Sequence, residues 1–121
     1  RVLNEPALVA MLERYNFSII EDKPRPVAEQ IALFHNADVV MGPHGAGFTN
    51  LLWCRPGTQV LELFNPHYTA NPYVYLATVL GLRYAACVNG PVRPINYRAM
   101  AEDITVNVAD VERAIVRILG R

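Results

Sequence analysis

The residues best suited to chemistry lie in one short segment, Gly42-Pro43-His44-Gly45-Ala46-Gly47. Three glycines in six residues permit positive φ angles and a close approach of the backbone to a ligand. If a strand ends at Met41 and a helix starts at Phe48, the segment presents unpaired N–H groups and the positive end of a helix dipole to an anion. The segment therefore predicts a phosphate site, although a tight turn that binds nothing explains the same glycines.

Three polar side chains are placed to contact such an anion. The His44 imidazole could donate a hydrogen bond to a phosphate or sugar oxygen, and Thr49 and Asn50 lie in the first turn of the following helix. A His44 side chain that is exposed or bonded locally is the alternative. The spacing G-x-x-G-x-G differs from the dinucleotide fingerprint, and no Gly-Lys-Ser/Thr follows it as in a Walker loop. A kinase and a dehydrogenase are therefore disfavoured.

One acidic residue, Glu62, interrupts the apolar run of residues 60–64. Near the carboxyl end of a strand, its carboxylate could accept hydrogen bonds from two ribose hydroxyls. A structural ion pair with Arg1 or Arg55 is the other interpretation. The chain contains no Asp-x-Asp pair to hold a divalent cation against a nucleotide diphosphate. We therefore expect a metal-independent site that needs no cofactor.

The glycine segment needs elements that hold it, and the hydrophobic periodicity predicts them. Apolar residues at helical spacing indicate helices, the first with Asn4 as its N-cap and the last with Asn107 and Asp110 as a capping pair. Short apolar runs between the helices indicate strands. The expected helices span residues 5–15, 27–37, 48–54, 73–80 and 108–119, and the expected strands span 17–20, 38–41, 59–64, 83–88 and 104–106. This alternation predicts a Rossmann-like three-layer α/β/α domain with a mainly parallel sheet.

Length and composition fit one globular domain that spans residues 1–121. The chain is 52% hydrophobic and 18% charged, which is unlike a disordered protein. Its 11 acidic and 11 basic residues leave no positive field that would attract a nucleic acid backbone. The sequence starts at Arg1 directly in a helical pattern, so we expect a domain of a longer enzyme.

These motifs together resemble glycosyltransferase family 61. The resemblance is carried by the glycine segment with Thr49-Asn50-Leu51 after it, by Pro56-Gly57, and by Val60-Leu61-Glu62-Leu63. Further similar features are Arg1 with Asn4-Glu5, Glu29-Gln30, and the tyrosine-rich stretch of residues 73–84. The resemblance covers nearly the whole chain.

The resemblance implies the C-terminal half of a GT-B-like enzyme, which has two Rossmann-like domains. It implies an inverting transfer from a nucleotide diphosphate sugar, usually a UDP-sugar, to a hydroxyl of a glycan or protein. Arg1, the glycine segment, Thr49, Asn50 and Glu62 would bind the donor. His44 would be the catalytic residue, in contact with phosphate or sugar. The N-terminal acceptor-binding domain, which often supplies the general base, would be missing, so this half alone should be inactive or weak.

Two other functions fit the same residues. A noncatalytic nucleotide- or phosphoglycan-binding module would keep the fold without transfer, and a sugar-nucleotide epimerase or hydrolase is a weaker rival. Family members in capsular polysaccharide synthesis, and helices rich in alanine and arginine, favour a cytoplasmic bacterial enzyme. The Golgi or ER lumen is the alternative compartment, and the two cysteines do not decide between them.

Overall fold

A computed structural model of the chain describes residues 1–70 and 72–121. In this part of the chain, a parallel sheet forms from β1 (Val39–Pro43), β2 (Gln59–Phe64) and β3 (Arg83–Val88), in that spatial order. β2 lies in the middle, with Val40 opposite Val60 on one side and Tyr84 opposite Val60 on the other. The predicted α/β class and parallel sheet are confirmed.

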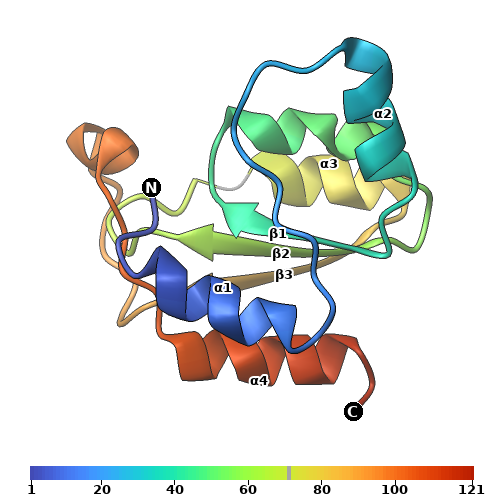
Figure 1. Ribbon diagram of the computed structural model, residues 1–121. Helices are drawn as coiled ribbons and strands as arrows, with labels where there is room; N and C mark the ends of the chain where they lie inside the picture. The colour runs from blue at the N-terminus through green and yellow to red at the C-terminus, as the bar shows by residue number, and fades with distance from the viewer. Residues whose placement is uncertain (71) are drawn as a thin grey trace.

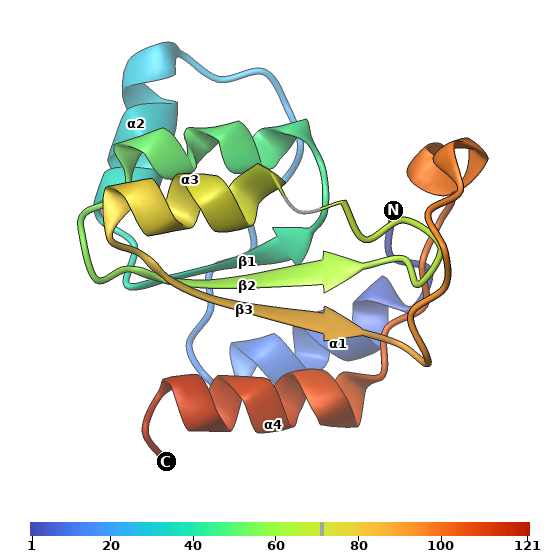
Figure 2. The same ribbon diagram turned by 180° about the vertical axis from the view of Figure 1, so that it is seen from behind.

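Helices cover both faces of this sheet (Figures 1 and 2). α1 (Glu5–Glu13) and α4 (Val108–Ile118) lie on one face. α2 (Val27–His35), the 3₁₀ helix η1 (Ala46–Trp53) and α3 (Pro72–Leu80) lie on the other. Because η1 joins β1 to β2 and α3 joins β2 to β3, each connection returns the chain to the same end of the sheet. The Rossmann-like, three-layer prediction is therefore confirmed.

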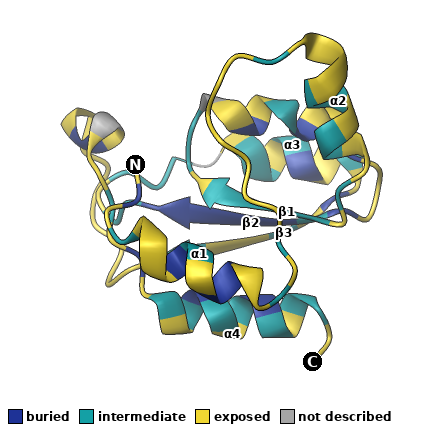
Figure 3. Ribbon diagram, in the orientation of Figure 1, coloured by how far each residue is buried: buried dark blue, intermediate teal, exposed yellow. Residues whose placement is uncertain are grey.

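The two faces of β2 build two separate cores. Leu61 and Leu63 are 0% and 1% exposed and pack against α1 and α4. Val60, which points to the opposite face, is also 0% exposed and packs with Phe48 and Leu51 of η1. Figure 3 shows β2 as the most continuously buried strand. Its apolar sequence follows from this central position, because helices cover both of its faces.

The two predicted helix caps have different outcomes. The Asn107 side chain accepts a hydrogen bond from the Asp110 backbone N–H at 3.1 Å, which confirms the N-cap of α4. Asn4 occupies the N-cap position of α1, but its side chain makes no capping hydrogen bond. Its amide instead pairs with the Val106 backbone, donating to the carbonyl at 2.8 Å and accepting from the N–H at 3.0 Å. Together with the parallel bridge between Val2 and Ile104, this pair replaces the predicted strand 104–106 and fastens the N-terminal segment to the one before α4.

Residues 17–20 do not form the predicted strand. They carry the chain from the α1 layer to the α2 layer (Figure 1), so no neighbouring strand offers them a hydrogen-bonding partner. In the glycine segment, Gly42 and Pro43 extend β1, and the positive φ values occur at other glycines. The segment therefore does not use the positive φ angles that its glycines permit. Among the described residues, no helix has the length and apolarity needed to cross a membrane.

Candidate functional site

The period of two along a strand brings the predicted site residues to one side of the sheet. Gly42 lies opposite Glu62 in the β1–β2 register, and His44 follows two residues after Gly42 on the same side. The His44 backbone N–H donates to the Leu63 carbonyl at 2.8 Å and so continues the pairing beyond the end of β1. His44 is thereby held at the carboxyl end of the sheet, beside Glu62.

His44, Glu62 and Tyr84 form a chain of hydrogen bonds across all three strands. Nδ1 of His44 lies 2.5 Å from one carboxylate oxygen of Glu62, and the Tyr84 hydroxyl donates to the other oxygen. Glu62 is 0% exposed. Burial, and then the Glu62 carboxylate, raise the pKa of the Tyr84 hydroxyl well above its usual value, so this tyrosine stays neutral.

The partners of Glu62 are therefore not the arginines that the sequence suggested. Arg55 donates to the His35 carbonyl at 2.9 Å and lies 3.6 Å from Asp38, at the opposite end of the strands. The Arg1 side chain is 81% exposed. A neutral tyrosine and a histidine take the place of a guanidinium, which satisfies both oxygens of Glu62 without a permanent positive charge beside it.

Aromatic rings hold the His44 imidazole in place. Phe64 stacks on it with ring centroids 5.2 Å apart and an interplanar angle of 24°. The rings of Tyr68 and Tyr73 lie tilted against it at 5.7 and 5.5 Å. These contacts fix the orientation of His44, and 18% of its side chain remains exposed.

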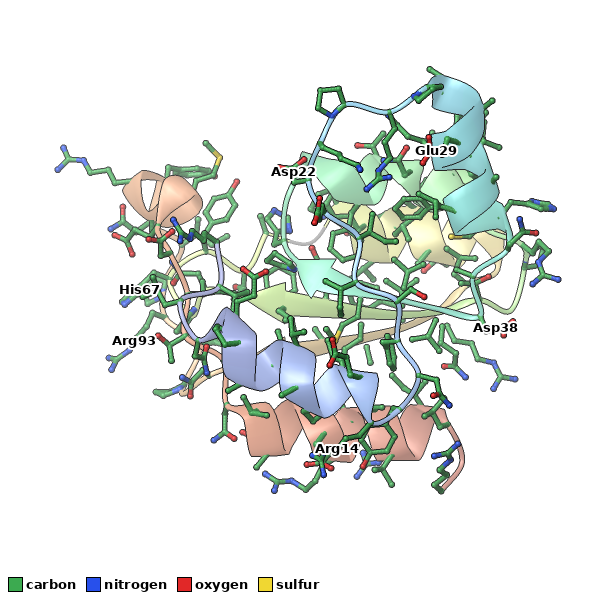
Figure 4. All side chains as sticks on the ribbon, in the orientation of Figure 1. Arg14, Asp22, Glu29, Asp38, His67 and Arg93 are labelled. Atoms are coloured by element: carbon green, nitrogen blue, oxygen red, sulfur yellow. The ribbon has the colours of Figure 1, made fainter. Side chains whose placement is uncertain are left out.

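His44 lines an open pocket of about 90 Å³ at the carboxyl end of the strands. Arg1, Pro43 and His44 line it together with residues from after β2 and around the 3₁₀ helix η2 (Tyr97–Ala101). The remaining lining residues are Leu63, Asn65, Tyr68, Met100, Glu102 and Ile104. Figure 4 labels His67 at this end of the molecule and Asp38 at the other. The pocket thus lies where open parallel sheets bind their ligands.

The structure brings together only some of the predicted contacts. Gly47 and Thr49 are exposed on η1, and the Asn50 amide donates to the Gly47 carbonyl at 3.1 Å, away from the pocket lining. Gly45 is extended, and the placement of the Ala46 side chain lies outside the described part. Because Glu62 is closed to solvent, a role for it in donor binding has to act through His44 and stays a prediction.

Sequence reasoning missed four polar or aromatic residues of the site. Asn65 and Tyr68 directly follow β2, so the rule that selected the segment after β1 would also have indicated them. Tyr84 lies on the same sheet face as Glu62, but its partner is visible only from the register of β2 and β3. Glu102 lines the pocket because the bridge between Val2 and Ile104 brings its segment beside the N-terminal segment. No local sequence signal indicates that contact.

In the described ranges, no group of three or more His, Cys, Asp or Glu side chains is arranged to hold a metal ion. The metal independence of the site stays a prediction. The pocket instead places the Arg1 and His44 side chains beside Asn65 and Tyr68. The Asn65 amide donates to the Ala99 carbonyl and to Glu102, which also lines the pocket. Arginine, histidine and tyrosine in such a lining can contact an anionic or polyhydroxylated ligand.

The parallel sheet, the glycine-rich turn after β1 and the polar pocket at the strand ends define an α/β domain of the kind that binds nucleotides and sugars. Residues 1–61 match the family model described as Glycosyltransferase 61. The chain belongs to glycosyltransferase family 61. The match includes Arg1 and the whole segment Gly42 to Gly47 and ends one residue before Glu62.

Its relatives include EGF domain-specific O-linked N-acetylglucosamine transferases from animals. The Drosophila melanogaster protein is 37% identical over 87 residues, which are 69% of this chain and 16% of that protein. The Xenopus laevis protein is 34% identical over 95 residues, covering 74% of this chain and 18% of the relative. The Mus musculus protein is 32% identical over 89 residues, covering 69% and 17%. The chain thus spans less than a fifth of these relatives.

Proposed function

We propose that this chain is the donor-binding, C-terminal domain of an inverting, metal-independent glycosyltransferase. The observation that carries the proposal is His44, an imidazole that contacts a fully buried carboxylate and lines the pocket at the strand ends. A group that contacts a departing phosphate must be held in place before the reaction, and this geometry holds it. His44 is the residue to which we assign catalysis.

Charge stabilisation of the leaving diphosphate is the chemistry that the pocket can supply. Arg1 provides a permanent positive charge, and the second ring nitrogen of His44, Nε2, provides either a donor or an acceptor. Both side chains line the same pocket, so one diphosphate could contact both. Pro43 and His44 form one wall of the pocket, and along this wall the glycine segment would contact the donor.

The names of the relatives specify the transferred sugar as N-acetylglucosamine and the acceptor as an EGF domain. We therefore propose UDP-N-acetylglucosamine as the donor and a protein hydroxyl as the acceptor. EGF domains are disulfide-dense and form in oxidising compartments. The lumen of the ER or Golgi, the alternative compartment in the sequence analysis, is accordingly the location that we propose.

The size of the pocket supports a site that is shared with another domain. A volume of about 90 Å³ is well below the roughly 300–1,000 Å³ of sites that enclose a small-molecule ligand. A nucleotide sugar would therefore remain largely uncovered on this chain alone. We propose that a preceding acceptor-binding domain closes over it and supplies the general base, and that the isolated chain binds donor weakly and turns it over poorly.

Calorimetric titration tests donor binding. UDP, UDP-N-acetylglucosamine and GDP are titrated into the chain with and without Mg²⁺, and the titrations are repeated on His44→Ala, Arg1→Ala and the control His35→Ala. We expect metal-independent binding of the uridine ligands that both pocket substitutions weaken by about tenfold or more, because each removes a charged or polar contact to phosphate. His35 is exposed at the end of α2, so its substitution should leave the affinity unchanged. Equal affinity in all variants would contradict the proposal.

Gly47→Ala tests whether the donor lies against the glycine segment, in a variant that should fold as the wild type does. A Cβ at position 47 would meet no atom within 4 Å, and Gly47 has no positive φ, so the folded chain should tolerate alanine. If the donor lies against the glycine segment, Gly47→Ala weakens donor binding without changing the free energy of unfolding. An unchanged affinity would remove Gly47 from the proposed contacts.

Transfer itself requires the full-length protein. Incubation with UDP-N-acetylglucosamine and a folded EGF domain should yield a glycosylated acceptor, detected by intact mass, and His44→Ala should abolish it. Donor binding with no transfer to any tested acceptor would favour the noncatalytic binding module. Release of free sugar without an acceptor would favour a hydrolase.

A further inference from the structure

Tyr84 is a partly buried titratable residue that belongs neither to the glycine segment nor to the pocket lining. It lies on β3, opposite Val60, on the sheet face that Glu62 also occupies. Its hydroxyl donates to the carboxylate oxygen of Glu62, on the neighbouring strand β2, that His44 leaves free. His44, Glu62 and Tyr84 therefore stand on or beside β1, β2 and β3, and each strand contributes one member of the chain of hydrogen bonds.

The Tyr84 hydroxyl is the donor at one end of this chain of hydrogen bonds. Because burial raises the pKa of its hydroxyl, Tyr84 stays protonated and donates a hydrogen bond to Glu62. A carboxylate at Glu62 accepts hydrogen bonds at both oxygens, and its second oxygen then takes the Nδ1–H of His44 as donor. Nε2 is then the ring nitrogen that remains for a ligand. Among the described residues, no hydrogen-bond partner of Nε2 occurs.

We propose that Tyr84 is a positioning residue of the donor site: Tyr84 and the buried Glu62 form a relay that fixes the His44 ring with its proton on Nδ1 and presents Nε2 to the pocket. The consequence of this relay for transfer rests on the function proposed above, whereas the protonation of the ring does not. A free imidazole prefers the opposite tautomer, with the proton on Nε2, so the relay makes a distinctive prediction for the chain without any ligand.

Removal of the Tyr84 hydroxyl should reverse the His44–Glu62 bond. In Tyr84→Phe, one oxygen of a carboxylate with 0% exposure loses its donor. A buried acceptor left without a partner is unfavourable, and uptake of a proton by Glu62 relieves it. A protonated Glu62 would donate to Nδ1, which places the ring proton on Nε2. The substitution thus switches the tautomer although position 84 does not touch the histidine ring.

The tautomer is measured by long-range ¹H–¹⁵N NMR spectra of the labelled chain, at a pH where the ring of His44 is neutral. We expect a protonated Nδ1 in the wild type and a majority of protonated Nε2 in Tyr84→Phe and in Glu62→Gln, whose amide can donate to Nδ1. Tyr75→Phe removes a hydroxyl from a tyrosine that is 74% exposed on α3 and should match the wild type. A wild-type ring protonated on Nε2, or an unchanged tautomer in both variants, overturns the relay.

Kinetics of the full-length enzyme test whether the relay serves transfer. Tyr84→Phe should lower kcat about tenfold or more while KM for the donor changes less than about twofold, because the hydrogen bond is to a charged group and acts on the reacting geometry. Tyr75→Phe should keep the wild-type kcat. A wild-type kcat in Tyr84→Phe overturns the positioning role. If the tautomers switch as expected but the wild-type enzyme transfers no sugar, the relay stands and the proposed function fails.

Discussion

The sharpest test of the His44–Glu62 pair is the stability of His44→Ala. The substitution removes one of the two hydrogen-bond donors of a carboxylate that has 0% exposure, and it removes the ring stacked on Phe64. A hydrogen bond to a charged group contributes about 1.5–3 kcal/mol, and an aromatic pair about 0.5–1.5 kcal/mol. His44 is 18% exposed, so water entering through the pocket can solvate part of the carboxylate. We therefore expect a loss of about 2–3 kcal/mol in the free energy of unfolding.

Urea unfolding followed by circular dichroism measures this loss. With a slope of about 1–3 kcal/mol per molar urea, the midpoint should fall by roughly 1–2 M at unchanged slope. The control His35→Ala removes only an exposed contact of the ring with the Trp53 carbonyl at 3.3 Å and should cost at most about 0.5–1 kcal/mol. In a Glu62→Gln background, His44→Ala should cost only about 1–2 kcal/mol, since the unpaired group is then neutral. Equal stabilities of His44→Ala and His35→Ala would refute the pairing of a buried carboxylate with His44.

Three further predictions concern the core, the pH dependence of stability and the thiols. Leu61→Ala, at 0% exposure, should cost about 2–5 kcal/mol in chemical unfolding, whereas Leu3→Ala, at 60% exposure, should cost less than about 0.5 kcal/mol. The raised pKa of Tyr84 means that the folded chain keeps a proton which the unfolded chain releases above about pH 10. The stability advantage of wild type over Tyr84→Phe should therefore shrink as the pH rises from 9 to 11, and a constant difference would contradict this. Burial raises the pKa of Cys54 and Cys87, so iodoacetamide should label both slowly at neutral pH until urea unfolds the chain.

Sequence patterns predicted the elements whose signals are local. The ranges of β2 and β3 match the expected strands 59–64 and 83–88, because both are apolar runs bounded by turn residues, although only β2 is buried on both faces. The Asn107 cap is likewise set by residues three positions apart. Predictions failed where a distant segment provides the partner. Asn4 has the residue type of a cap, but its amide pairs with Val106, 102 positions away.

The site was predictable to the extent that a single strand determines it. The position of His44 after β1 follows from the strand and the glycines, and Glu62 is identified by its charge within an apolar run. Their mutual contact depends on the register between β1 and β2, and the contact of Tyr84 depends on the register between β2 and β3. Register is a property of the folded sheet, so the sequence indicated an arginine partner where the structure has a histidine and a tyrosine.

The same alternation that builds the core therefore also builds the site, and this couples function to stability. Glu62 occupies a position where its neighbours Leu61 and Leu63 are fully buried, so the carboxylate is tolerated only while His44 and Tyr84 satisfy it. A substitution that deletes a member of the relay changes both the folded fraction and the geometry of the ring. Variants that keep shape, such as Tyr84→Phe and Glu62→Gln, are the ones whose activity can be attributed to the proton positions. An alanine variant informs on transfer only when its unfolding is measured alongside.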